Sequence, residues 1–226
     1  MGGSAVLGDF TPGISDLNFV AVIAPGVRRS TWSAIDEAHR LLLALDPSCP
    51  LDGIYIDADE LAAATAVTSG PCVRAGTFAL SGAHGRDALR WHAIEGCGEV
   101  LRGDGSLPSV PRWLRGSDLD AAVLEAAGRV SSSTDESATV RNRQAFASQV
   151  LEVTRLHYTL ATSRFCSKAK AGLYGLVTFG SSEAVIEAAL RARRNPLAQT
   201  FPPSEDVVTA FVRMVLADLA EVASGT

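Results

Sequence analysis

The sequence contains few cysteines, and their spacing excludes several kinds of site. Its 226 residues include only four cysteines, and no two of them form a CxxC pair: Cys49, Cys72, Cys97 and Cys166. A structural zinc site or a redox dithiol needs closely spaced thiols, and a disulfide scaffold is typical of much shorter secreted chains. We therefore expect four reduced thiols in a cytoplasmic protein.

Long apolar runs and an excess of basic charge are also missing. No segment approaches the roughly 18 apolar residues that a membrane span needs, and Met1-Gly2-Gly3-Ser4 shows no basic region followed by an apolar one, as a secretory signal would. The formal net charge is −5, which argues against a partner recognised mainly through its phosphate backbone. We expect neither a membrane nor a nucleic acid as a partner.

The first half of the chain mixes short apolar runs, which are typical of strands, with helical patterns. The predicted strands are Leu17–Ala24, Leu51–Ile56 and Arg74–Leu80, and the predicted helices are Trp32–Leu45 and Asp87–Gly96. In the first helix one face should point inward, with Ile35, Ala38, Leu42 and Leu45. A Pro- and Ser-rich segment, Ser106–Pro111, is the best candidate for a domain boundary, so the predicted domains are residues 1–110 and 111–226.

The second half has helical periodicity almost throughout. The predicted helices cover Asp118–Val130, Gln144–Ala161, a segment from Ser182 to Asn195, and a last one opened by Pro202-Pro203-Ser204. A polar loop is predicted over Ser131–Ala138. Two of the helices carry apolar stripes at helical spacing, with Phe146, Val150, Val153, His157 and Leu160 on one and Val208, Phe211, Val212, Val215 and Leu219 on the other. These patterns predict an all-helical unit.

One group of residues near the start of the chain points to chemistry. Gly3-Ser4 would form a turn with exposed backbone N–H groups and a hydroxyl, which together suit a phosphate. About ten residues later a strand begins with Asp16 and Asn18, and side chains two apart on a strand project to the same face. A carboxylate at such a position can hold Mg²⁺ that bridges nucleotide phosphates.

These residues resemble a known family. Gly-Ser followed by Asp-x-Asp at a strand start is the nucleotidyltransferase signature, and GSAVLGDFTPGISDLNFVAV is similar to the aminoglycoside (3″) adenylyltransferases that modify streptomycin and spectinomycin. The segment Leu151–Leu176 resembles the helical C-terminal domain of the same group. The resemblance implies an α+β fold: an N-terminal nucleotidyltransferase-like mixed β-sheet with helices, followed by an all-helical C-terminal domain.

The resemblance also implies roles for individual residues. Gly3 and Ser4 would bind the triphosphate of ATP, and Asp16, with Asn18, would ligate Mg²⁺. Asp52 would act as the base on the acceptor hydroxyl, and Lys168 would reach the phosphates from the helical domain. The implied reaction transfers AMP from ATP to a hydroxyl of a small molecule, such as an aminoglycoside, in a monomer whose site lies between its two domains.

Two features depart from the family pattern. Asn18 stands where the motif has a second Asp, so one charge that would hold Mg²⁺ is missing. The chain also begins at the signature itself, without the helix and strand that relatives place before it, which predicts an unpaired sheet edge and a flexible Gly3-Ser4 turn. A second hypothesis is therefore a catalytically weakened member that binds nucleotide or ligand without turnover. A third, less favoured, is an interaction protein that uses its helical domain as a docking surface.

The same side chains also have ordinary structural interpretations. Asp16 could cap a turn, Asp52 could lie at a strand edge, and Lys168 could be a solvated lysine at a helix end. We expect Trp91 and His157 to be core residues. Arg141-Asn142-Arg143 occupies a region where streptomycin-modifying relatives carry acidic residues, and this argues against a polycationic acceptor.

Overall fold

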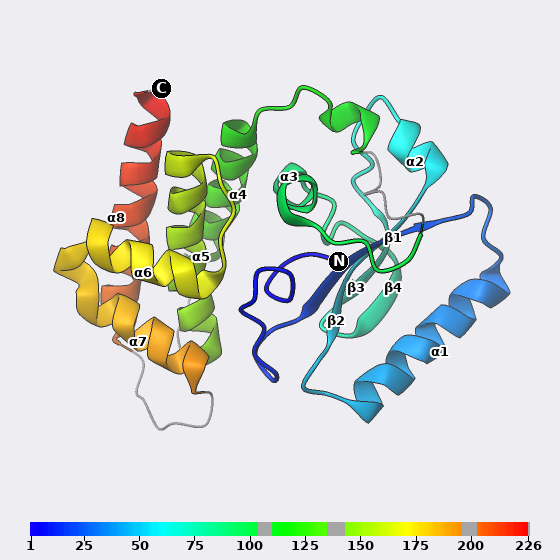
Figure 1. Cartoon of the computed structure of the whole chain (residues 1–226), viewed down its shortest axis with the longest axis horizontal. Helices are drawn as coiled ribbons and strands as arrows, with labels where there is room; N and C mark the ends of the chain where they lie inside the picture. The colour runs from blue at the N-terminus through cyan, green and yellow to red at the C-terminus, as the bar shows by residue number, and fades with distance from the viewer. Residues whose placement is uncertain (104–109, 135–142, 196–202, 226) are drawn as a thin grey trace. The chain divides into compact units, whose positions relative to one another are not determined.

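The computed structural model describes residues 1–103, 110–134, 143–195 and 203–225, and the chain falls into two compact units (Figure 1). They are Met1–Ser117 and Asp118–Thr226. Each unit has its own hydrophobic core, so each is described by itself. The first unit holds the sheet and the second consists of helices, which confirms the predicted α+β class. The division at residues 110 and 111 stays a prediction.

The first unit is built on a four-stranded sheet in the order β1-β2-β3-β4. The strands are β1 (Leu17–Ile23), β2 (Leu51–Asp57), β3 (Gly70–Arg74) and β4 (Thr77–Gly82). Strands β1 and β2 are parallel and the other two pairs are antiparallel, so the sheet is mixed as predicted. The single strand predicted over Arg74–Leu80 is wrong: Ala75 and Gly76 have positive φ angles of 48° and 79° and turn the chain back between two strands.

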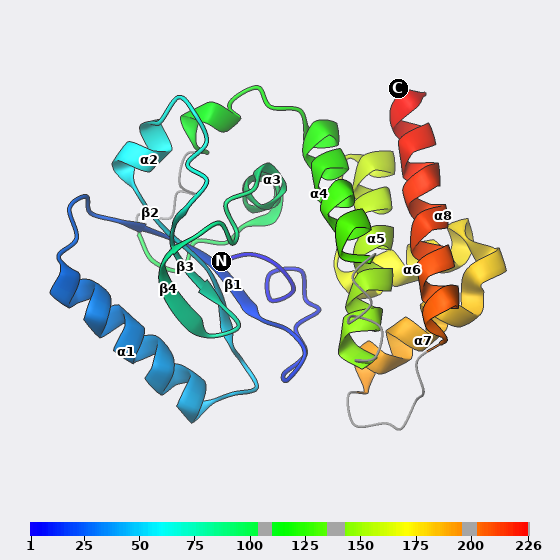
Figure 2. The same cartoon turned by 180° about the vertical axis from the view of Figure 1, so that it is seen from behind.

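Helices cover both faces of this sheet, as the two opposite views show (Figures 1 and 2). The elements are α1 (Arg29–Leu45), α2 (Ala58–Ala62), α3 (Ala88–Cys97) and the short η1 (Arg112–Leu114). Successive side chains of β2 point to opposite faces of the sheet. Ile54 packs in the core with Trp91 of α3, whereas Tyr55 packs against Trp32 of α1. Trp91 is a core residue, as expected.

The predicted inward face of α1 is wrong for three of its four residues. Ala38, Leu42 and Leu45 are exposed, the last to 82%, while His39 is buried. The ring of His39 stacks between those of Phe19 and Phe78, with centroid distances of 6.2 and 6.0 Å, and its Nε2 pairs with the Tyr55 hydroxyl at 2.8 Å. The helix is therefore rotated so that an aromatic layer, rather than a leucine stripe, meets the sheet.

Burial of His39 makes the stability of the first unit sensitive to acid. Desolvation lowers the pKa of His39, although Asp36 one turn earlier opposes this, and Nδ1 is buried without a hydrogen-bond partner. Since the unfolded histidine binds a proton more readily, the free energy of unfolding should fall as pH drops from about 6.5 towards the lower folded pKa. Urea denaturation at pH 7.5 and 5.5 measures this, because all three tryptophans (Trp32, Trp91 and Trp113) lie in this unit.

The control is His39→Gln, which keeps a neutral group near the Tyr55 hydroxyl but cannot titrate in this range. Its unfolding free energy should depend less on pH between 7.5 and 5.5 than that of the wild type. Equal pH dependence in the two proteins would show that His39 is not the group responsible.

The start of the chain pairs with β1 at one point of the expected open edge. Gly2 forms an antiparallel bridge with Asn18 on β1, donating its N–H to the Asn18 carbonyl at 2.9 Å. Met1 and Glu99 exchange backbone hydrogen bonds, at 2.6 Å from the amino terminus and 2.9 Å from the Glu99 N–H. The bridge covers β1 only beside the signature, and β1 is otherwise the outer strand of the sheet, so the predicted open edge is closed at Asn18 alone.

The second unit is a bundle around one central helix. Its elements are α4 (Leu119–Thr134), α5 (Arg143–Thr162), α6 (Lys168–Thr178), η2 (Gly180–Ser182), α7 (Glu183–Arg194) and α8 (Glu205–Ser224). Helix α5 packs against α4, α6, α7 and α8. Both predicted apolar stripes are buried, and His157 is a core histidine whose ring nitrogens pair with Asp218 and Tyr174 at 2.7 and 2.9 Å.

Two smaller predictions for this unit have different outcomes. The loop predicted over Ser131–Ala138 is wrong for residues 131–134, which continue α4, and its remainder lies outside the described residues. All four cysteines lie in the described part of the chain, and none of them forms a disulfide bond. Among the described helices, none combines the length and the apolar character that crossing a membrane requires.

Candidate active site

Asp16, Asn18 and Asp52 lie together where two parallel strands begin. Asn18 on β1 is the register partner of Asp52 on β2, and Asp16 precedes β1 by one residue. Because all three positions have the same parity, their side chains project to the face of the sheet that α3 covers. Asn18 Nδ2 donates to the Asp16 backbone carbonyl at 3.1 Å, which leaves its Oδ1 as the acceptor.

The Gly3-Ser4 turn lies against this group. Gly3 has a φ of 69°, and a Cβ at this position would be only 3.1 Å from Asn18 Cγ, so glycine permits the close approach. The turn uses its carbonyls internally: Leu7 N–H donates to Gly3 O at 3.1 Å, and Asp9 N–H to Ser4 O at 2.9 Å. In the described chain, the N–H groups of Ser4 and Ala5 donate to no backbone carbonyl. They are therefore available to an anion.

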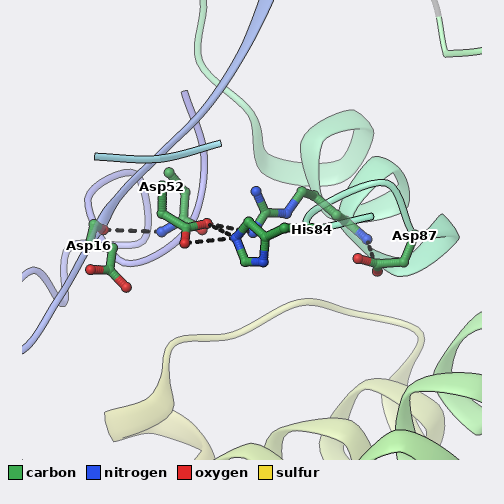
Figure 3. A network of polar contacts seen from close by, with 6 residues as sticks. Asp16, Asp52, His84 and Asp87 are labelled. Carbon is green, nitrogen blue, oxygen red and sulfur yellow. Dashed lines mark hydrogen bonds and ion pairs between the residues drawn. The ribbon is translucent and has the colours of Figure 1, made fainter. Parts of the chain in front are cut away.

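Asp52 is buried, and its carboxylate forms hydrogen bonds with the side chains of His84 and Arg90 (Figure 3). His84 Nε2 lies 2.8 Å from both carboxylate oxygens, and Arg90 Nη2 donates to Oδ1 at 2.8 Å. Asp52 is 6% exposed, so these partners replace the water that a buried carboxylate loses. The arrangement places Asp52 between Asp16 and His84 in the view of Figure 3.

The loop between β4 and α3 fixes the two partners of Asp52. Arg86 is buried and anchors the loop by pairing with Glu60 and donating to the Tyr55 carbonyl at 2.8 Å. Asp87 then caps α3, since its Oδ1 accepts the Arg90 N–H at 3.1 Å. His84 and Arg90 therefore project from a short segment that is anchored at both of its ends.

Sequence reasoning did not identify His84 or Arg90. Their contacts with Asp52 join residues 32 and 38 positions apart, and neither belongs to a local motif. Two other polar residues of this region have structural partners: Asp87 caps α3, and His92 Nε2 pairs with the Ser117 hydroxyl at 3.0 Å. The only signal available was a histidine after a predicted strand, which is too common to select a site.

Lys168 lies in the second unit, at the first residue of α6. Its Nζ donates to Ser148 Oγ at 2.6 Å and lies 3.7 Å from Glu152 Oε2. Burial raises the pKa of Glu152, but Arg155 and Lys168 together outweigh this and lower it. Residues 141 and 142, of the segment expected to matter for the acceptor, lie outside the described residues.

The described residues offer a limited donor set for a cation. They include no group of three or more His, Cys, Asp or Glu side chains arranged to hold a metal ion. Asp16 supplies a carboxylate and Asn18 an amide oxygen, while Asp52 is occupied by Arg90 and His84. Mg²⁺ is commonly held by one or two carboxylates together with substrate phosphates, so this set fits Mg²⁺ only when a nucleotide supplies further oxygens.

Comparison with known proteins covers both units. Residues 117–218 match the family described as the aminoglycoside adenylyltransferase C-terminal domain. A solved structure of spectinomycin adenyltransferase AAD(9) from Enterococcus faecialis, determined with ATP and spectinomycin, has a similar fold, with a TM-score of 0.69 and 14% identity. The similarity covers 97% of this chain and 90% of that one. No curated protein matches the sequence.

Proposed function

Since this chain is aminoglycoside adenylyltransferase-like in its fold and in residues 117–218, we propose that it transfers AMP from ATP to a hydroxyl of a small molecule. The observation that carries the proposal is the contact between the Gly3-Ser4 turn and Asn18, beside Asp16 and Asp52. Free N–H donors, a carboxylate and an amide oxygen converge on one edge of the sheet. That combination suits a nucleotide triphosphate and a cation that accompanies it.

The proposal gives each of these side chains a role in the reaction. The N–H groups of the Gly3-Ser4 turn bind the triphosphate, and the Ser4 hydroxyl adds one further donor. Asp16 and the Asn18 amide oxygen hold Mg²⁺, which supplies charge neutralisation to the phosphates when it is bound. Lys168, at the start of α6 in the matched domain, contributes its charge to phosphate binding.

Position 18 is expected to set the rate of this enzyme. In the wild type, Asn18 Nδ2 donates to the Asp16 carbonyl. The variant Asn18→Asp loses that hydrogen bond and adds a carboxylate beside Asp16 and Asp52, so we expect Mg²⁺ to raise its thermal midpoint more than that of the wild type. With Mg²⁺ and ATP present, transfer should rise by about one to two orders of magnitude, because a second carboxylate would bind more firmly the cation that neutralises the negative charge developing on the phosphates.

The measurement uses α-labelled ATP, Mg²⁺ and a panel of hydroxylated acceptors that includes spectinomycin and streptomycin. Label recovered on an acceptor with the wild-type protein supports the proposal. If neither the wild type nor Asn18→Asp labels any acceptor, the proposal that the protein transfers AMP to these acceptors is wrong. A labelled acceptor with the variant alone would favour the weakened member, in which Asn18 permits binding but limits turnover.

A further inference from the structure

We propose that His84, rather than Asp52, takes the proton from the acceptor hydroxyl, with Asp52 acting as the group that orients the imidazole. This inference rests on the proposed AMP transfer and assigns its proton acceptor. It starts from the Asp52, His84 and Arg90 contacts, which connect β2, the β4–α3 loop and α3 (Figure 3).

The Asp52 carboxylate is poorly placed to accept a proton from an incoming hydroxyl. Its two oxygens already accept from His84 Nε2 at 2.8 Å, and Oδ1 also accepts from Arg90. The residue is 6% exposed, whereas a base must come within about 3 Å of the hydroxyl it deprotonates. A hydroxyl would have to displace one of these donors to reach Asp52.

His84 has the opposite character. Its side chain is 29% exposed. An ionised carboxylate can only accept, so the hydrogen bond to Asp52 places the proton of a neutral imidazole on Nε2 and leaves the lone pair on Nδ1. Among the described residues, the His84 ring forms hydrogen bonds through Nε2 to Asp52, which leaves Nδ1 for an incoming group. A carboxylate that fixes one ring nitrogen while the other acts as a base is an arrangement that orients histidines in many enzymes.

The loop around His84 supports this role because it holds the imidazole in place. Arg86 anchors the chain two residues later through Glu60 and the Tyr55 carbonyl. The position of Asp52 is fixed by β2, and Arg90 supplies a cation that keeps the carboxylate compensated. The pair is thus preorganised before a substrate binds.

The proton of the acceptor hydroxyl passes to His84 Nδ1 while the hydroxyl oxygen forms a bond to the α-phosphorus of ATP. The bond from that phosphorus to the oxygen of the β-phosphate breaks, and pyrophosphate leaves with the electron pair. The imidazolium, stabilised by the Asp52 carboxylate, then returns its proton to solvent.

The deciding variant is His84→Gln, whose amide nitrogen can still donate to Asp52 but has no basic nitrogen. With an acceptor that the wild type labels, we expect kcat to fall about 10²- to 10⁴-fold with little change in KM for ATP. A purely structural role of His84 in holding Asp52 predicts nearly unchanged kcat in this variant. A fall in kcat of less than about threefold in His84→Gln would overturn the inference and leave Asp52 as the base.

Chemical rescue provides the second, independent measurement. In His84→Ala, added imidazole should restore turnover at least about tenfold, because it can occupy the vacated space and accept the proton. The matched control is His92→Ala, which removes the histidine that pairs with Ser117 and should gain nothing from imidazole. Tryptophan fluorescence checks that each variant is folded. No rescue in a folded His84→Ala protein would count against the inference, whereas absence of transfer by the wild type would overturn the proposed function as well.

Discussion

Asp16→Asn is expected to lower AMP transfer by about 10³-fold or more, which is a loss of about 4 kcal/mol of transition-state stabilisation. Asp16 provides the charged ligand of the proposed cation site, and its neighbour Asn18 provides only an amide oxygen. With a single carboxylate at this position, the wild type has no second charge to compensate for its loss. The effect should therefore be larger than that of the same substitution in a site with two carboxylates.

The readout separates binding from chemistry. Calorimetry with ATP and Mg²⁺ should show weaker binding for Asp16→Asn, and the labelled-ATP assay should show the loss of transfer. The matched control is Asp59→Asn, which removes one negative charge from an exposed position near the start of α2. Transfer by Asp16→Asn within tenfold of that by the control would show that Asp16 does not hold the cation.

Much of the site could be predicted because its main residues are close in the sequence. Gly3, Ser4, Asp16 and Asn18 form a local motif, and in the structure the turn lies against Asn18 of the strand. Asp52 belongs to the next predicted strand, and parallel pairing brings it beside Asn18. The roles of these residues remain proposals, whereas their proximity is observed.

The parts that could not be predicted depend on contacts between distant residues. His84 and Arg90 reach Asp52 from a loop and a helix that no local pattern connects to β2. The inward face of α1 was mispredicted because hydrophobicity favoured Leu42 and Leu45, whereas the aromatic rings of the sheet select His39. In both cases tertiary packing, rather than local periodicity, decides which side chains come into contact.

Gly53 illustrates the same principle with a large effect on stability. It is the register partner of Phe19 on β1, and it immediately follows Asp52. A Cβ at Gly53 would lie 2.2 Å from the Phe19 carbonyl oxygen and 2.6 Å from Cδ1 of its ring. The ring cannot simply turn away, because it packs against Tyr55 with a centroid distance of 5.5 Å and stacks on His39.

Gly53→Ala is therefore expected to reduce the free energy of unfolding of the first unit by about 3 kcal/mol or more. One of the overlapping atoms belongs to the backbone, so relief requires β1 to move relative to β2, and this would also displace Asn18 from Asp52. Urea denaturation followed by tryptophan fluorescence measures the loss. The control is Gly2→Ala, whose added Cβ meets its nearest neighbour, Ile94, at an ordinary 3.8 Å and should cost less than about 1 kcal/mol. Equal stability of Gly53→Ala and Gly2→Ala would contradict this prediction. It would show that the packing of Phe19 against Gly53 does not set the spacing of β1 and β2, the two strands that carry the site.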